Sequence, residues 1–328
     1  MSLTTRQILA LQSLSGVGKQ SILKVGNYCS QPIDIADLPN ILAKCAVKKK
    51  NPEGKSKIAI TAQDIEAALQ SADQSIQRAQ EQQIGILSYY DAEFPNNLRN
   101  TKTEDGQKAD PPVLLFYKGD INALKYPCLA IIGTRNNTPE GEKAGLYLSE
   151  SFARRGFCIV SGLAIGCDSF AHRGALNAKG KTIAFLAHGL DTVYPAQNKD
   201  LAQEIVLNGG LLLSEYDLGT RVTQYNLVAR DRLQAGLALA TLVIQTGIKG
   251  GTMHAAKGCV NSGKPLFVVK YKDSKTDNDE QTQGNHMLVK EAGATYIKGT
   301  DNLDEIAQTI LKSGCCDGKP SAIQTSLL

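Results

Sequence analysis

The chain has 328 residues, of which 42% are hydrophobic, and a formal net charge of +4. This length predicts one large or two modest domains with a sizeable core, and the small charge excludes a surface that is basic overall, so any contact with nucleic acid must be local. Eight cysteines without a CxxC pair predict reduced thiols, and the lack of a long apolar run or a signal-peptide core predicts a soluble, cytoplasmic protein with no membrane contact.

Residues 1–84 are expected to form a small all-helical domain. Apolar segments flank Ser15-Gly16-Val17-Gly18, and this arrangement resembles a helix-hairpin-helix, whose turn presents backbone N–H groups to a DNA phosphate. The alternative is an ordinary helical hairpin whose glycines only turn the chain. A basic stretch from Lys48 to Lys57 predicts a solvated surface turn, and a long polar helix is expected from 61 to 83.

Residues 85–112 are expected to be a linker that starts the sheet domain, with a short strand at 85–90. A sheet domain is then predicted over 113–312, followed by a flexible tail at 313–328. Candidate strands fall at 113–117, 128–132, 157–160, 182–187, 210–213, 241–246, 265–269 and 294–297. Helical segments are expected at 139–155, 168–178, 198–208, 226–239, 252–262 and 283–292.

This alternation of helices with nearly all-apolar strands predicts an α/β fold with a doubly wound, mainly parallel sheet. Residues 272–284 are acidic and polar, and a mobile excursion is expected there. Ligands bind such sheets beyond the carboxyl ends of the strands, so the loops that follow the strands are the place to search for a site.

Glycine, hydroxyl and basic residues gather in those loops, which is the chemistry of a site that holds phosphates without cleaving them. The strand at 128–132 ends in Gly133-Thr134-Arg135, and a helix opens directly afterwards at Thr138-Pro139-Glu140. The candidate site residues are Gly133, Thr134, Arg135, Ser161, Gly162, Gly166, Asn198, Lys199, Arg230, Arg232, Lys249, Gly250, Gly251 and Thr252.

Several other chemistries are not favoured by the pattern. Asp168 and His172 are spaced to share a helix face, but without further ligands at suitable spacing we expect a capping carboxylate and a hydrogen-bonded structural histidine. Ser161 is not in a hydrolase nucleophile elbow, and neither a GxGxxG turn nor a P-loop follows the first central strand, so no cofactor or metal is expected.

Two alternatives stay open within the candidate site. Arg230 and Arg232 either reach a ligand phosphate or pair with Asp231 and Glu215. Three tyrosines either stack on nucleic-acid bases or pack at the core or rim: Tyr194, Tyr216 and Tyr225.

The ordered motifs resemble those of the DNA-processing protein A family (DprA, also called Smf) over about residues 110–300. The matching motifs are Gly-Thr-Arg (133–135), Ser-Gly-Leu-Ala-x-Gly-x-Asp-x-x-Ala-His (161–172), Gly-Leu-Asp-x-x-Tyr-Pro-x-x-Asn (189–198), Ser-Glu (214–215) and Arg-x-Arg-x-x-Ala-Gly-Leu (230–237).

The resemblance implies an extended Rossmann-like domain preceded by a domain similar to a sterile alpha motif. It also implies single-stranded DNA binding, homodimerisation through the sheet domain, and loading of a RecA-type recombinase onto incoming DNA in natural transformation. The implied DNA contacts centre on Arg135, Lys199, Arg230 and Arg232.

The sequence departs from the family pattern at several positions. Gly-Thr-Arg replaces a family Gly-Ser-Arg, and Gly250-Gly251-Thr252 replaces a usual Ser-Gly-Ser. A family Phe-Pro-x-Arg-Asn-Arg becomes Leu-Val-Ala-Arg-Asp-Arg at 227–232, which loses the proline and puts Asp231 between two arginines. The C-terminal winged helix of many members is not expected, because the chain ends soon after the sheet. These differences indicate a divergent branch.

Two functions from different classes therefore remain. The favoured one is a non-enzymatic protein that holds and protects single-stranded DNA for a recombinase, with Arg135 as its principal phosphate anchor. The alternative is a nucleotide-processing enzyme similar to phosphoribohydrolases, in which Glu215 or Asp168 would stabilise a ribosyl cation.

Overall fold

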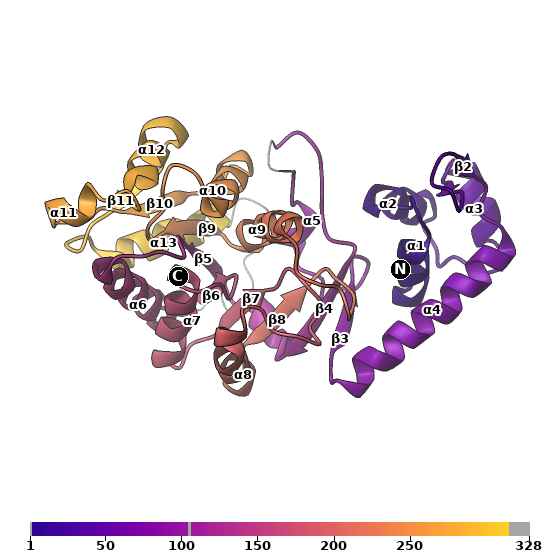
Figure 1. The fold of residues 1–328 in the computed structure, drawn as a ribbon, viewed down its shortest axis with the longest axis horizontal. Coiled ribbons are helices and arrows are strands. Elements are labelled where there is room, and N and C mark those ends of the chain that lie inside the picture. The colour runs from indigo at the N-terminus through magenta and orange to yellow at the C-terminus, as the bar shows by residue number, and fades with distance from the viewer. Residues whose placement is uncertain (1, 104–105, 315–328) are drawn as a thin grey trace.

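The computed structural model describes residues 2–103 and 106–314, and the chain begins with four helices. These are α1 (Thr5–Ser13), α2 (Lys19–Tyr28), α3 (Leu38–Lys44) and α4 (Ala62–Glu81), gathered at one end of the molecule (Figure 1). Thr4 and Thr61 begin α1 and α4 as capping boxes, in which each threonine side chain accepts an N–H that would otherwise lack a partner.

A short antiparallel hairpin, β1 (Lys49–Lys50) with β2 (Lys57–Ile58), stands where a solvated surface turn is expected. The N–H of Lys50 donates to the carbonyl of Ser15 over 2.7 Å. Gly16 has φ +84°, and a Cβ placed on it would lie 2.8 Å from Cγ of Lys50. The glycine turn is therefore packed against the hairpin, which accounts for Gly16 without a DNA contact.

A nine-stranded sheet forms the body of the molecule. Its strands are β3 (Gly85–Ser88), β4 (Leu114–Gly119), β5 (Cys128–Ile132), β6 (Cys158–Ser161), β7 (Thr182–Phe185), β8 (Leu211–Ser214), β9 (Ala240–Val243), β10 (Leu266–Val269) and β11 (Thr295–Ile297). They lie in the order β11-β10-β9-β5-β6-β7-β8-β4-β3, and all pairs are parallel except β3–β4 and β4–β8. The doubly wound, mainly parallel sheet is confirmed.

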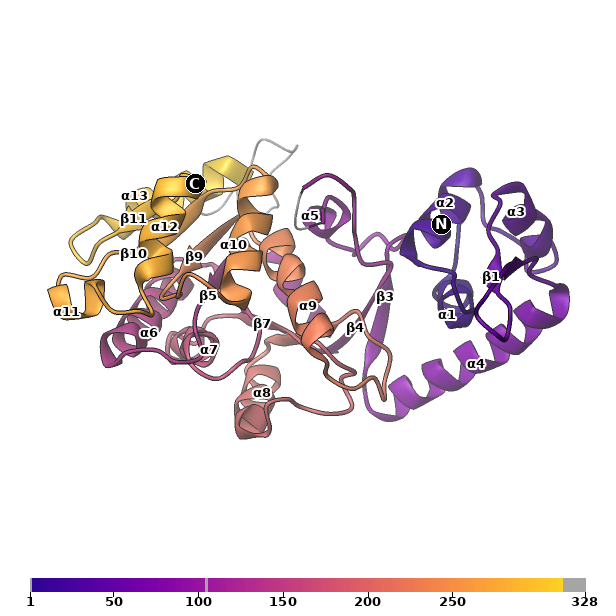
Figure 2. The ribbon, with the colours of Figure 1, turned by 45° about the horizontal axis from the view of Figure 1, so that its top comes forward.

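Helices cover both faces of this sheet (Figures 1 and 2). The longer ones are α6 (Pro139–Arg154), α7 (Cys167–Asn177), α8 (Lys199–Leu207), α9 (Gln224–Leu237), α10 (Gly251–Asn261), α12 (Gln283–Ala292) and α13 (Leu303–Gly314). Alternate residues of β5 divide between the two faces: Leu129 and Ile131 pack with α6, α7 and α13, whereas Cys128 and Ala130 pack with α9. A strand buried on both faces must be apolar throughout, which explains the continuous run at 128–132.

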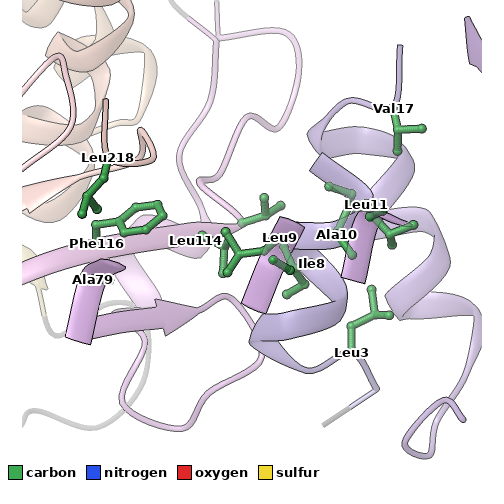
Figure 3. Close-up of a cluster of buried hydrophobic side chains, with 14 of the residues drawn as sticks. Leu3, Ile8, Leu9, Ala10, Leu11, Val17, Ala79, Leu114, Phe116 and Leu218 are labelled. Atoms are coloured by element: carbon green, nitrogen blue, oxygen red, sulfur yellow. The ribbon is translucent and has the colours of Figure 1, made fainter. Parts of the chain in front are cut away.

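The N-terminal helices share a core with the edge of the sheet. Leu9 of α1 and Ala79 of α4 belong to the same buried cluster as Leu114 and Phe116 of β4 (Figure 3). Ser75 of α4 also donates its hydroxyl hydrogen to Oδ2 of Asp217, at 2.6 Å. The two regions are therefore joined by apolar burial as well as by hydrogen bonds.

The strands and helices predicted between residues 113 and 297 are all present, with ends that differ by a few residues. Short elements were not predicted: α5 (Asn96–Arg99), α11 (Ser274–Asp277) and the 3₁₀ turns Ile121–Lys125 and Ala196–Asn198. The polar stretch at 272–284 is held in place rather than projecting freely, since Thr282 is buried and donates to carbonyls of its own loop. The flexible tail expected at 313–328 is wrong at residues 313 and 314, which belong to α13, and the rest of it lies outside the described residues. None of the described helices is long and apolar enough to cross a membrane.

Candidate functional site

A polar cavity of about 270 Å³ opens beyond the carboxyl ends of β5 and β9. The chain runs outward from β5 through β6, β7 and β8, then returns to the other side of β5 to form β9, β10 and β11. The loops after β5 and β9 therefore diverge to opposite faces, and such a switch point is where doubly wound sheets bind ligands. The cavity is lined by Gly133, Thr134, Arg135, Ala164, Asp168, Gln224, Leu227, Val228, Arg230, Asp231, Gln234, Thr246, Gly247, Lys249, Gly250, Gly251, Thr252 and Gln281, among others.

Two glycines let the loop after β5 approach its neighbours. A Cβ on Gly133 would stand 2.6 Å from Sγ of Cys167. Gly166, with φ +81°, would place a Cβ 2.6 Å from the carbonyl oxygen of Thr134. Because both contacts are with fixed atoms, neither position tolerates a side chain without a backbone shift.

Gln245, which follows β9, holds this loop in place. Its carbonyl accepts the N–H of Thr134 at 2.7 Å, and its side-chain oxygen accepts the N–H of Thr138 at 2.9 Å. Its Nε2 donates to the hydroxyl of Thr138 at 2.8 Å. Gln245 thus fixes both ends of the segment that carries Arg135.

Arg135 and Lys249 are exposed at the rim of the cavity. Within residues 2–103 and 106–314, neither side chain makes an ion pair. Next to Lys249, helix α10 begins at Gly251, and its N-cap Gly250 provides no side-chain hydrogen bond. The first N–H groups of α10 and two available cations therefore meet at one edge, which suits an anion.

Arg230 forms the floor of the cavity rather than its rim. It is 4% exposed, and its Nη1 donates to the carbonyl of Gly162 at 2.7 Å and to that of Phe185. Its Nε donates to Oδ1 of Asp231 at 3.1 Å. Its burial favours the pairing alternative over direct phosphate contact, because these acceptors already occupy Nη1 and Nε.

Arg232 lies outside the cavity, at the junction with the N-terminal helices. Its Nη2 pairs with Oε2 of Glu215 at 2.7 Å and its Nε with Oδ2 of Asp110 at 2.6 Å. Lys19 of α2 completes the cluster, 2.8 Å from Oδ1 of Asp110. The pairing alternative is thus the one the structure shows for Arg232, and Glu215 is held in ion pairs instead of facing the cavity.

The remaining predicted residues shape the turns around the cavity. Ser161 is buried and donates to the carbonyl of Ile131 at 2.7 Å, and the N–H of Gly162 donates to Oδ2 of Asp168 at 3.2 Å. Asn198 is buried and donates to the carbonyl of Leu163 at 2.8 Å. Lys199 is exposed but lines a separate depression with Asp191, so the structure does not bring it to the rim.

Asp168 and His172 have the structural roles expected of them. Asp168 accepts N–H groups of the turn before α7, although the N-cap of that helix is Gly166. The hydroxyl of Thr182 donates to the carbonyl of Ile159, so Nδ1 of His172, 2.7 Å from that oxygen, must donate to it. Burial lowers the pKa of His172 to about 3 and keeps the ring neutral. No group of three or more metal-type ligands is found among the described residues.

Sequence reasoning missed three residues that matter at the site. Gln245 and Gln281 are polar but carry no charge or motif; Gln281 accepts the hydroxyl of Thr134 at 2.8 Å from a loop expected to be mobile. Asp231 lines the cavity, whereas the sequence suggested only a partner for arginine. The sequence feature that could have pointed to Asp231 is its replacement of the family asparagine, which turns Arg-Asn-Arg into Arg-Asp-Arg at 230–232.

The fold and the site define a Rossmann-like α/β protein with a polar pocket at the switch point of its sheet and two exposed cations at the rim of that pocket. The chain belongs to the DNA recombination-mediator protein A family, whose model matches residues 53–308. This confirms the resemblance to the DprA/Smf family and places the chain among DNA-processing proteins.

Curated relatives support the assignment. The DNA processing protein DprA of Streptococcus pneumoniae is 31% identical over 308 residues, which are 93% of this chain and 99% of that protein. Protein Smf of Escherichia coli is 32% identical over 197 residues, 60% of this chain and 52% of that protein. The chain thus spans nearly all of the pneumococcal relative but about half of the Escherichia coli one.

Two solved structures are similar along most of their length. The S. pneumoniae DprA structure has a TM-score of 0.72 at 30% identity and covers 93% of this chain and 99% of its own. The DprA of Helicobacter pylori, described for its single-stranded DNA binding mode, has a TM-score of 0.59 at 32% identity, with coverage of 70% and 96%.

Proposed function

We propose that this protein binds single-stranded DNA through the cavity beyond β5 and β9, protects it, and helps to load a RecA-type recombinase onto it. The setting is DNA processing in natural transformation or recombination, in the cytoplasm. The protein acts as a homodimer and as a binding protein, not as an enzyme. The single observation that carries the proposal is the pair of available cations, Arg135 and Lys249, beside the N-terminus of α10.

The chemistry of the rim supports a phosphate-bearing ligand. An exposed arginine on a loop fixed by Gln245 presents its guanidinium fork with little loss of backbone freedom. Tyr225 is 80% exposed, next to the cavity residue Gln224, and offers a surface on which a base can stack. The single-stranded DNA binding described for the H. pylori relative agrees with this chemistry.

A strand preference follows from the size of the site. The cavity of about 270 Å³ is a narrow depression at a sheet edge, with few cations around it. A protein that reads the base sequence of duplex DNA places a helix or a β-ribbon in the major groove, and none of the strand-end motifs of this chain forms such an element. In a competition assay we expect single strands to displace a labelled oligothymidine better than blunt duplex does. Equal or tighter duplex binding would contradict the proposal.

Substitution of Arg135 by alanine tests the site directly. Loss of a charge-assisted contact should weaken binding to a short oligothymidine by about ten- to a hundredfold and flatten the salt dependence by about one phosphate contact. Arg135→Lys should recover only part of the loss, because an ammonium cannot replace the fork. Fluorescence anisotropy at several salt concentrations measures both effects.

The matched control is Arg154→Ala. Arg154 lies at the C-terminal end of α6, is exposed, and pairs with Glu150 one helical turn away. This variant removes the same charge from the opposite edge of the sheet and should bind like the wild type. If folded Arg135→Ala also binds like the wild type at every salt concentration, DNA does not cross this strand end.

A further inference from the structure

Asp231 lies beside the N-terminus of α10. A Cβ placed on Gly251, the first residue of α10, would stand 3.3 Å from Oδ2 of Asp231. Helices α9 and α10 pack side by side (Figures 1 and 2), so this contact is part of a fixed interface. The carboxylate therefore lies next to the position that a ligand anion would take at this helix terminus.

The orientation of Asp231 is set by its neighbours. Its Oδ1 accepts Nε of Arg230 at 3.1 Å and Nε2 of Gln234 at 3.1 Å. Oδ2 is the atom left facing α10. Because Arg230 is itself held by two backbone carbonyls, the side chain of Asp231 cannot turn away without breaking its hydrogen bonds.

The charges around the cavity almost cancel. Among the residues that the structure describes, three cations line it, namely Arg135, Arg230 and Lys249, together with two carboxylates, Asp168 and Asp231, so that these groups sum to one net positive charge when both carboxylates are ionised. A phosphodiester in a nucleic-acid chain carries one negative charge, whereas a terminal phosphate monoester carries nearly two at neutral pH. The cavity is thus matched in charge to an internal phosphodiester.

We propose that Asp231 makes the cavity selective for internal phosphodiesters over terminal phosphate monoesters, by placing a carboxylate where the second charge of a monoester would lie. This inference rests on the proposed function and names the phosphate class that the same site takes. Because the electrostatic repulsion by Asp231 is proportional to the charge of the ligand, it costs a dianion about twice as much binding free energy as a monoanion.

Protonation of Asp231 should relax this selectivity. Burial raises the pKa of Asp231 to about 6, while the adjacent Arg230 acts in the opposite direction. The other charged or titratable groups that face it are Asp168 on α7, His254 on α10, and the rim cations Arg135 and Lys249. Since this pKa is above that of an ordinary aspartate, the carboxylate gains its proton as the pH falls through about 6, and repulsion of the ligand should fade there.

Asp231→Asn is the appropriate variant, because asparagine keeps an oxygen for Arg230 and Gln234 while the charge is removed. The probes are thymidine 5′-monophosphate and its methyl ester, each used to displace a labelled oligothymidine near pH 8. We expect the variant to bind the monophosphate about tenfold more tightly than the wild type does, and the methyl ester and the oligothymidine about threefold more tightly. Glu66→Gln, an exposed carboxylate on α4, is the matched control and should change none of these values.

A second measurement uses the pH dependence of oligothymidine binding, whose diester charge does not titrate in this range. Wild-type affinity should rise as the pH is lowered from about 8 to about 5.5, and Asp231→Asn should show a flatter profile. The inference would be overturned if Asp231→Asn bound the monophosphate and its methyl ester more tightly by the same factor, or bound neither more tightly. It would also be overturned if the monophosphate did not displace oligothymidine from the variant. If the variant does not fold, a wild-type affinity that stays flat or falls on acidification overturns it.

The two proposals fail in different ways. If the wild type does not bind oligothymidine, or if Arg135→Ala is without effect, the proposed function fails. If Arg135→Ala weakens binding but Asp231→Asn leaves the monophosphate and diester affinities in their wild-type ratio, only the role of Asp231 is wrong.

Discussion

The rim of the cavity and the junction with the N-terminal helices use the same residue type in opposite ways. Arg135 at the rim is exposed, and in the described part of the chain no carboxylate pairs with it. Arg232 at the junction is 9% exposed and is held by Glu215 and Asp110. The family resemblance implies a DNA contact for both, through different motifs, and the sequence leaves pairing with a carboxylate open for Arg232.

The difference shows that the neighbours of a cation decide whether its charge is available. An exposed guanidinium exchanges water for a ligand phosphate at little cost, whereas a buried one that lost its carboxylates would leave uncompensated charge behind. The cations of the rim are therefore the ones available to a ligand, whereas Arg232 at the junction joins the sheet to the N-terminal helices.

The largest effect is expected from Arg232→Ala. Among the described residues, this change leaves Glu215, whose side chain is 10% exposed, with the more distant Lys19 as its one counter-charge, at 3.6 Å. Breaking a buried pair in this way should lower the free energy of unfolding by about 3–5 kcal/mol. Urea denaturation measures it. Arg6→Ala breaks an exposed pair with Asp73 and should cost no more than about 1 kcal/mol. Similar losses in the two variants would show that burial does not make the Arg232 pair more important for stability than the exposed Arg6 pair.

Unlike Arg135 and Arg232, His172 is a buried titratable group that is held in its neutral form. Its pKa of about 3 lies below that of a histidine in the unfolded chain, so the unfolded state takes up a proton first as the pH falls. Its contribution to stability is complete above about pH 6.5, and roughly 2 kcal/mol of it should be lost by about pH 5. Stability curves of His172→Asn, measured by urea denaturation across this range, should fall less steeply. A slope equal to that of the wild type would show that His172 is accessible to protons.

A moderate effect on binding is expected from Lys249→Ala. Lys249 is exposed at the rim and lies on the loop before α10, so its removal should weaken oligothymidine binding by about three- to tenfold without loss of stability. Anisotropy titration gives the affinity, and thermal unfolding provides the control. A large drop in stability would mean that this lysine is a structural residue like Arg232.

The smallest effect is expected from Lys199→Ala. Lys199 lines the depression with Asp191 and not the cavity, so a short oligothymidine should bind this variant within about twofold of the wild type. Longer strands offer a sharper test, because only they can reach beyond the rim. A loss with the short ligand as large as that of Arg135→Ala would extend the binding path to α8.

Local patterns were sufficient to predict the elements and the general place of the site. Apolar runs such as 128–132 report burial on both faces, and the glycine-rich loops after them must lie at the carboxyl edge of a parallel sheet. These are properties of a few neighbouring residues. The availability of each charge depends instead on distant partners: Gly162 is 68 positions from Arg230, and Asp110 is 122 positions from Arg232.

The sequence by itself thus determined the α/β architecture, the family and the strand-end loops that surround the cavity. Only the tertiary structure decided the strand order, the burial of Arg230, the ion pairs of Arg232, and the entry of Asp231 and Gln281 into the cavity. The physical reason is that periodicity and turn chemistry act between residues close in the chain, whereas electrostatic pairing and desolvation depend on which residues the finished fold brings together.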